Sequence, residues 1–334
     1  MASTVPWVEK YRPATIDQVA HQEQAVETLR NALQTGNLPH LLFYGPPGTG
    51  KTSTILALAK DLYGPELYKS RVLELNASDE RGIEVVRNKI KNFASLSVSS
   101  TAGGKSHGHP CPPFKLIVLD EADSMTTDAQ SALRRTMETY TRVTRFCIIC
   151  NYVSRIIGPI ASRCAKFRFA NLPKEIMVTR LTEIAAKENF TLDPAIANEL
   201  MNVSGGDLRK AITLLQNCHV LHGKQITPKN ITEAGSHIPD NILEELMAAC
   251  RSNSFENAEN AVYNIIAEGY PAHQLLSQLS GHLMGEGGKA LSSKSKAIMC
   301  KHLGSTDKCL VDGADETIQL LSFAAVAMQA IQAA

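Results

Sequence analysis

The chain has 334 residues, 44% of them hydrophobic and 20% charged, which is typical of a globular protein of two or three domains. The net charge is +1, but from Pro239 onward there are 6 Lys/Arg against 11 Asp/Glu, whereas the preceding part carries 28 against 22. The start, MASTVPWVEKYRP, lacks the apolar core of a secretory signal, and the longest apolar stretch, LLSFAAVAMQAIQAA, is too short for a membrane span. We therefore expect no membrane partner, a cytosolic or nuclear location, and contact of any polyanion with the basic front part.

The first 170 residues alternate between apolar strand-like runs and helical patterns. The expected strands are 40–45, 71–77, 115–120, 145–150 and 166–169, and the expected helices run from about 51 to 62, 82 to 94 and 127 to 140. This alternation predicts a parallel sheet with helices on both faces. The Gly/Ser-rich segment 97–113 reads as a loop to which we assign no function.

Beyond Asn171 the patterns are helical only, with a linker expected around residues 235–239. The expected helices are 174–188, 195–203, 208–221, 229–234, 240–250, 255–267, 271–284, 294–303 and 316–332. The domains expected from this pattern are 1–171, 172–237 and 238–334.

Eight scattered cysteines predict free thiols rather than a disulfide framework. Cys147 and Cys150 form a CxxC, but they lie in the strand-like run RFCIIC, where residues three apart point to opposite faces. A zinc site is therefore not expected there.

The segment GPPGTGKT, Gly45–Thr52, matches the phosphate-binding pattern G-x-x-x-x-G-K-[ST] between an expected strand and an expected helix. The glycines let backbone N–H groups surround phosphate oxygens, and the helix start adds the positive end of its dipole. We expect Lys51 to reach the β- and γ-phosphates of ATP and Thr52 to ligate Mg²⁺. A Gly-rich turn without function is the alternative.

Two carboxylates follow the expected strand LIVLD: Asp120 and Glu121. The carboxyl edge of such a sheet is where ligands bind, so we expect Asp120 to hold Mg²⁺, directly or through water, and Glu121 to act as general base. Asn151 ends the next strand; its amide could orient the attacking water or contact the γ-phosphate, or it could cap the following segment. Together with Lys51, these residues predict a nucleotide hydrolase.

An ordered series of motifs extends this reading over the whole chain. The motifs are WVEKYRP (7–13), FYGPPGTGKTS (43–53), ELNASDERGI (74–83), LDEADSMT (119–126), ALRRTME (132–138), CNYVSRI (150–156), ASRCAKFRF (161–169) and GDLRKAI (206–212). They resemble the box motifs of replication factor C small subunits, most of all the group numbered fourth in animals. The resemblance implies an α/β AAA+ P-loop module with a parallel sheet, a small helical lid domain and an all-α collar domain for oligomerisation.

The resemblance also implies roles for single residues. Arg163 of the SRC motif would act in trans on a neighbour's site, and Arg209 would be a sensor in the lid; without the resemblance, either arginine could be a surface or salt-bridged residue. The implied nucleotide-binding set is Val8, Arg12, Gly45, Pro46, Pro47, Gly48, Thr49, Gly50, Lys51, Thr52, Ser53, Asn151 and Arg209.

The implied function is ATP-dependent loading of a ring-shaped sliding clamp onto primer–template DNA, in DNA replication and repair in the nucleus. The partners would be one large and three other small subunits, the clamp and the DNA. Basic residues expected to track duplex phosphates are Arg81, Arg87, Lys91 and Arg155. The helix expected at 82–94 carries Arg87 and Lys91 together at i, i+4 spacing, although a solvated basic face is the alternative.

Two other classes of function compete with this reading. The chain could belong to another AAA+ machine, such as a branch-migration helicase, in which case it would assemble as a homohexamer. It could also be a scaffold that no longer binds ATP, although neither Gly45–Thr52 nor the Asp120–Glu121 pair is damaged.

Overall fold

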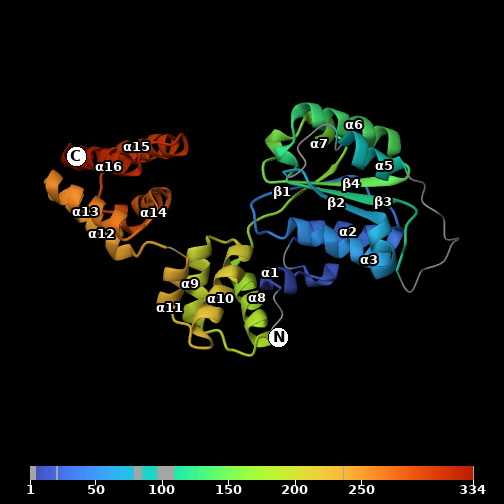
Figure 1. Cartoon of the computed structure of the whole chain (residues 1–334), viewed down its shortest axis with the longest axis horizontal. Helices are drawn as coiled ribbons and strands as arrows, with labels where there is room; N and C mark the ends of the chain where they lie inside the picture. Colours follow the sequence, from blue (N-terminus) through green and yellow to red (C-terminus); the bar gives the residue numbers. More distant parts are fainter. Residues whose placement is uncertain are drawn as a thin grey trace. The chain divides into compact units, whose positions relative to one another are not determined.

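A computed structural model describes residues 5–19, 22–78, 84, 86–95, 109–235 and 237–333. The chain divides into two compact units, Met1–Gln225 and Ile226–Ala334 (Figure 1). This division falls before the boundary expected near residue 237. Among the helices within the described residues, none has both the length and the apolar character that a bilayer span requires.

A five-stranded parallel sheet forms the centre of the first unit. Its strands are β1 (Leu41–Tyr44), β2 (Val72–Asn76), β3 (Lys115–Asp120), β4 (Thr144–Cys150) and β5 (Ala165–Arg168). They lie in the order β2-β3-β4-β1-β5, and each neighbouring pair is parallel. All five strands lie within a residue of the predicted bounds. β3 is the clearest case, because it is buried on both faces and its run is nearly free of polar interruptions.

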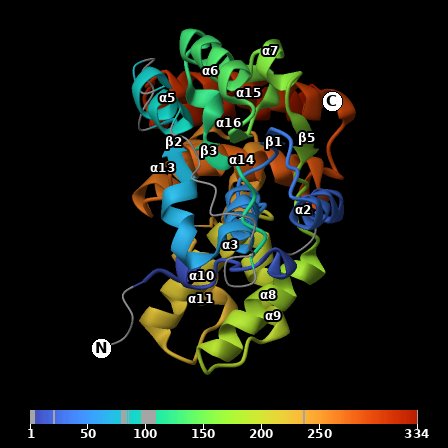
Figure 2. The ribbon, with the colours of Figure 1, turned by 90° about the vertical axis from the view of Figure 1, so that its right-hand side faces the viewer.

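Helices cover both faces of this sheet, as Figures 1 and 2 show. One face packs on α2 (Glu23–Thr35) and α3 (Lys51–Arg71), and the other on α5 (Lys91–Ser95), α6 (Thr127–Tyr140) and α7 (Gly158–Ala161). Alternate residues of β1, β3 and β4 supply the two cores, which is the expected consequence of a two-residue side-chain period. The parallel α/β fold class is confirmed.

β4 shows this alternation at its two cysteines. Cys147 is buried in the core under α2 and α3, whereas Cys150 is buried in the core under α6 and α7. Their side chains therefore lie on opposite faces of the sheet, as predicted, and both thiols are free. Burial raises the pKa of the Cys150 thiol to about 12, so this thiol is protonated at neutral pH.

Three helical features differ from the sequence expectation. α2 has no counterpart in that expectation, although EQAVETLRNALQT carries an amphipathic pattern. α3 is interrupted at Gly64, which takes non-helical angles (φ 62°, ψ 175°), and the helical stretch from Pro65 to Arg71 has no counterpart in that expectation. Within the helix expected at 82–94, Val86–Ile90 is a π-helix, η2, and the α-helix α5 follows it.

The first unit ends in a bundle of three helices, α8 (Lys174–Lys187), α9 (Pro194–Ser204) and α10 (Leu208–His222). α9 and α10 begin at aspartates whose side chains accept hydrogen bonds from the first-turn N–H groups, Asp193 and Asp207. The caps and the following apolar periodicity explain why these helices could be located from sequence to within a residue or two.

The described part of the second unit is helical throughout. Its helices are α11 (Pro228–Ala234), α12 (Asp240–Arg251), α13 (Phe255–Ala267), α14 (Ala272–Met284), α15 (Ser293–Val311) and α16 (Glu316–Gln332). The apolar C-terminal stretch forms α16, and its Phe323 and Ala327 are buried in the core of this unit. That stretch is therefore a packing helix, as its sequence predicts.

Candidate active site

The loop Gly45–Gly50 joins β1 to α3 and has a backbone that only glycine adopts without strain. Gly48 and Gly50 have φ values of 70° and 90°. A Cβ on Gly48 would also lie 1.9 Å from Asp207 Oδ1, so a side chain there would collide with the start of α10. α3 begins at Lys51 and no side chain caps it. Its first N–H groups are therefore oriented for an anionic ligand.

The side chain of Lys51, the first residue of α3, is bonded back to this loop. Its Nζ donates hydrogen bonds to Gly45 O (2.7 Å), Pro46 O (2.7 Å) and Asn151 Oδ1 (2.9 Å). Burial lowers the pKa of the ammonium, and the nearby Asp120 carboxylate opposes that shift. All three acceptors are uncharged oxygens, so the phosphates of a nucleotide would be stronger partners for this cation.

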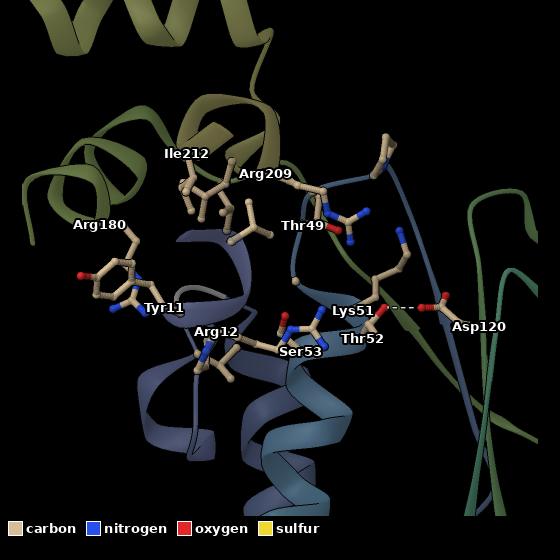
Figure 3. A pocket seen from close by; sticks show the side chains of 18 of the residues that line it. Tyr11, Arg12, Thr49, Lys51, Thr52, Ser53, Asp120, Arg180, Arg209 and Ile212 are labelled. Atoms are coloured by element: carbon tan, nitrogen blue, oxygen red, sulfur yellow. Dashed lines mark hydrogen bonds between the residues drawn. The ribbon is translucent and has the colours of Figure 1, made fainter. Parts of the chain in front are cut away.

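Thr52 and Asp120 come together as the sequence predicts. Thr52 Oγ1 donates to Asp120 Oδ2 at 2.6 Å, and Asp120 Oδ1 accepts a hydrogen bond from Glu121 N at 2.9 Å (Figure 3). A hydroxyl and a carboxylate at the phosphate end of the loop are the hard oxygen ligands that Mg²⁺ prefers. The donor set therefore fits the expected ion. Within the described residues no group of three or more His, Cys, Asp or Glu forms a separate metal site.

Glu121 follows the end of β3 in a left-handed conformation, with φ 52°. Ser124 supports this turn, because its Oγ donates to Glu121 O at 2.8 Å. The Glu121 side chain is exposed and lines the same pocket as Lys51 and Thr52. An exposed carboxylate at this edge can reach a water molecule beside the terminal phosphate.

Asn151 directly follows β4, the neighbour of β3 in the sheet. Its side-chain amide oxygen accepts the hydrogen bond from Lys51 Nζ, and Asn151 lines the pocket. Its backbone N–H donates to Asp123 Oδ2 at 3.2 Å. Of the two interpretations that the sequence left open, the geometry favours a role at the phosphates, because the amide faces Lys51.

The pocket has a volume of ≈ 260 Å³, near the lower end of the roughly 300–1,000 Å³ usual for small-molecule sites. It lies between the Gly-rich loop, the N-terminal segment and the lid helices. Figure 3 shows Arg209 extending from α10 toward Thr49 and Lys51, and Arg12 extending toward the start of α3. Of the predicted nucleotide-binding residues, Val8, Arg12, Pro47, Gly48, Thr49, Gly50, Lys51, Thr52, Ser53, Asn151 and Arg209 line it.

The remaining predicted nucleotide residues, Gly45 and Pro46, contact Lys51 through their carbonyls and are not part of the lining. The pocket also contains residues that sequence reasoning missed: Tyr11, Pro13, Gln18, Val19, Leu172, Arg180, Leu208 and Ile212. Two signals were available: Tyr11 and Pro13 lie in the motif WVEKYRP beside Val8 and Arg12, and the i, i+4 spacing of Leu208 and Ile212 beside Arg209 places them together on α10. Arg180 carried no such signal, since it reaches the pocket through tertiary contacts.

A short N-terminal helix, α1 (Trp7–Lys10), holds one wall of the pocket against the lid. The Trp7 ring stacks on Phe190 at a centroid distance of 6.2 Å, and Trp7 N donates to Gln216 Oε1 at 2.8 Å. Arg180 Nη2 donates to Tyr11 O at 2.8 Å. Because Val8, Tyr11 and Arg12 lie beside these anchors, movement of the lid would change this wall of the pocket.

Arg163 lies outside this pocket. Its Nη2 is 2.6 Å from Glu138 Oε1, and its Nη1 donates to Pro159 O at 2.5 Å. The structure thus contains the local carboxylate pair that the sequence left as an alternative, and it places the guanidinium away from Lys51.

The predicted DNA contacts are described only in part. Arg81 lies outside the described residues, and the structure gives no side-chain description for Arg87. Lys91 is exposed at the start of α5. Arg155 is exposed in the short helix η4 (Val153–Arg155), with its guanidinium 5.2 Å from the centre of the Tyr152 ring.

Three parts of the chain match known protein families. Residues 41–172 match the family described as "ATPase family associated with various cellular activities (AAA)", and residues 179–220 match "RCF1/5-like, AAA+ ATPase lid domain". Residues 238–326 match "Replication factor C C-terminal domain". The nucleotide-binding expectation and the expected order of module, lid and third helical domain are confirmed.

Curated relatives match over nearly the whole chain. Replication factor C subunit 2 of Oryza sativa subsp. japonica is 55% identical over 98% of this chain and 96% of its own length. Human replication factor C subunit 4 is 55% identical over 98% of this chain and 89% of its own, and the Archaeoglobus fulgidus small subunit is 43% identical over 96% of each. Among solved structures, a Thermotoga maritima RuvB variant superposes with a TM-score of 0.53 at 15% identity, covering 80% of this chain and 91% of that one. That likeness concerns the fold alone.

Proposed function

This chain belongs to the replication factor C family, the clamp loaders of DNA replication, and on that premise we propose how its ATPase site works inside a multi-subunit clamp loader. The observation that carries the proposal is the convergence of Lys51, the Thr52–Asp120 pair and Asn151 on one pocket. Lys51 and Thr52 come from the start of α3, Asp120 ends β3, and Asn151 follows β4. Each has the chemistry that one part of phosphoryl transfer needs.

ATP binds with its phosphates on the Gly45–Gly50 loop. Lys51 exchanges its carbonyl partners for the β- and γ-phosphate oxygens, a change that replaces neutral acceptors by anionic ones. Thr52 and Asp120 hold Mg²⁺, which supplies charge neutralisation on the phosphates when bound. The base lies toward Val8, Arg12 and the lid.

Hydrolysis requires a water molecule in line with the γ-phosphorus. Glu121 accepts a proton from this water while the new oxygen–phosphorus bond forms and the bond to the β,γ-bridging oxygen breaks, which releases phosphate and ADP. Asn151 positions the Lys51 ammonium relative to the γ-phosphate through the hydrogen bond to its side-chain oxygen. Arg209 extends from α10 toward the same loop and thereby makes the position of the lid depend on the nucleotide.

Arg163 serves the adjacent subunit. It lies on the surface outside its own pocket, from where it can supply positive charge to the γ-phosphate bound by a neighbour, as arginine fingers do. The complex contains one large and three other small subunits besides this chain. We assign the lid to 172–237 and a collar to 238–334, in which the helical second unit mediates oligomerisation.

The loader opens a ring-shaped sliding clamp and places it on primer–template DNA in the nucleus, in replication and repair. Arg81, Arg87, Lys91 and Arg155 contact duplex phosphates, a mode of binding that is independent of sequence. The acidic region from Pro239 onward and the more basic region before it support DNA contact through the front part.

The experiment that tests this function is the composition and turnover of the native complex. The complex is purified through a tag on this chain, its subunits are identified, and its ATPase is measured with clamp and primed DNA. A heteropentamer whose turnover falls with Glu121→Gln supports the proposal. A homohexamer of this chain would overturn it and favour a helicase.

A further inference from the structure

The carboxylate of Asp123 links the ends of two neighbouring strands. Asp123 lies in the short helix η3 (Ala122–Ser124), directly after β3 and Glu121. Its Oδ2 accepts hydrogen bonds from Asn151 N at 3.2 Å and from Tyr152 N at 3.1 Å, the first two residues after β4. One charged oxygen therefore satisfies both N–H groups where the chain leaves the sheet, a point at which no strand partner remains for them.

Asp123 is itself held in place by the turn that precedes it. Glu121 N donates to Asp120 Oδ1, and Ser124 N and Oγ both donate to Glu121 O, at 2.9 and 2.8 Å. Ala122 is buried in the core beneath α6, which fixes η3 against the sheet. The backbone of the turn that carries Asp123 is thus bonded on both sides of this residue.

The contact leads directly to the phosphate site. The backbone that Asp123 holds is that of Asn151, whose side-chain oxygen accepts from Lys51 Nζ at 2.9 Å. Without the two N–H bonds, the segment after β4 would lose the contact that sets the direction of the Asn151 side chain. The Asp123 charge also acts on Lys51 directly, because it raises the lysine pKa against the effect of burial.

We infer that Asp123 is a positioning residue for ATP hydrolysis: it holds Asn151 at the carboxyl end of β4 so that the Asn151 amide meets Lys51 and the γ-phosphate. The inference rests on the proposed role of Asn151. Asp123 itself does not line the pocket and needs no contact with the nucleotide. It connects the β3 turn that carries Glu121 to the β4 end that carries Asn151, so the two hydrolytic groups keep a fixed separation.

The test is a mutant cycle in the assembled complex. Asp123→Ala, Asn151→Ala and the double variant are compared with wild type by steady-state ATPase, and ATP binding is measured with a fluorescent analogue. We expect Asp123→Ala to lower kcat by about 10-fold or more while KM changes by less than about 2-fold, since the lost bonds set geometry rather than ground-state binding. The double variant should be no slower than Asn151→Ala alone, because the two residues act through one arrangement.

Two further variants separate positioning from folding. Asp123→Asn keeps an oxygen that can accept both N–H bonds and should recover most of the lost turnover. Asp128→Ala, an exposed aspartate in the first turn of α6, is the matched control and should leave kcat unchanged. If Asp123→Ala does not assemble into the complex, Asp123→Ser takes its place, since its shorter hydroxyl cannot span the same gap.

The test distinguishes a failure of the role proposed for Asn151 from a failure of the role inferred for Asp123. Normal turnover of Asn151→Ala would overturn the proposed role of Asn151 and the inference with it. Impaired Asn151→Ala with normal Asp123→Ala would overturn the inference alone. Additive losses in the double variant, or no recovery in Asp123→Asn, would also contradict it.

Discussion

The guanidinium of Arg163 pairs with the carboxylate of Glu138 within its own subunit, at 2.6 Å from Nη2 to Oε1. The two side chains are 40% and 41% exposed, and a pair so open to solvent contributes only about 0–1 kcal/mol. A triphosphate bound by a neighbouring subunit would offer more negative charge than the single carboxylate of Glu138 does. The guanidinium can therefore change partners on assembly at little cost.

Arg163→Ala is accordingly expected to leave the ATP affinity of this chain unchanged and to reduce hydrolysis at the neighbouring site by roughly 10³–10⁵-fold. The measurement uses a complex in which only the neighbour's site is competent. Arg142→Ala is the control. This exposed arginine lies before the start of β4, at the opposite end of that strand from Asn151 and the phosphate site. Normal turnover at the neighbour's site would mean that Arg163 only pairs with Glu138.

Lys51→Ala and Glu121→Gln should separate binding from chemistry. Lys51 contacts ground-state phosphates, so its loss should weaken ATP binding, whereas Glu121→Gln should bind ATP normally and lose about 10²–10⁴-fold in turnover. Equilibrium binding and single-turnover hydrolysis in the complex measure the two effects. Glu175→Gln, an exposed glutamate on α8, is the control. Wild-type hydrolysis by Glu121→Gln would refute the base assignment.

Much of this site could be predicted from sequence, because its groups follow strands whose burial is evident in the residues. β3 ends at Asp120 and β4 at Cys150, so parallel pairing alone brings Asp120, Glu121 and Asn151 to one edge. What the sequence does not carry is contact between distant segments. Arg180 bonds to the N-terminal segment, and Asp123 bonds across two strand ends; neither partner follows from local spacing.

The helices show the same limit. α6, α13 and α16 begin at side-chain caps that the sequence displays, Thr126, Ser254 and Asp315, and their bounds are as predicted. The π-helix at Val86–Ile90 has no comparable signature.

DNA binding should depend on Lys91 and Arg155, the two predicted DNA contacts that the structure shows to be exposed. Lys91→Gln with Arg155→Gln should weaken binding of primed DNA and reduce the magnitude of the log affinity–log salt slope by about 2, one for each lost phosphate contact. A salt titration of DNA affinity with ATP present measures both. Lys60→Gln, exposed on α3 across the sheet from α5, is the control. An unchanged slope would make these two residues a solvated surface.

Stability below neutral pH should depend on His40. This buried imidazole accepts a hydrogen bond from Phe146 N at Nδ1 (3.2 Å), and burial, aided by Arg145, lowers its pKa from 6.5 to about 4. Between these two pH values the unfolded state binds a proton that the folded state does not. The contribution of neutral His40 to the free energy of unfolding is therefore fully present above pH 6.5 and falls as the pH is lowered.

His40→Gln should therefore reduce the slope of unfolding free energy against pH in that window by about 1.4 kcal/mol per pH unit. Denaturant titrations of the full chain from pH 4.5 to 7 measure the slope. His222→Gln, at an exposed histidine that ends α10, should leave it as in wild type. Equal slopes for His40→Gln and wild type would show that His40 does not stay neutral in the fold.

Clamp retention on DNA tests most directly the claim that ATP at the Gly45–Thr52 site drives loading. Complex purified through this chain is incubated with the sliding clamp, primed circular DNA and ATP, and the clamp that remains on DNA is measured after gel filtration. We predict that retention requires ATP and is lost when the complex carries Lys51→Ala. Equal retention with Lys51→Ala, or without ATP, would contradict the account.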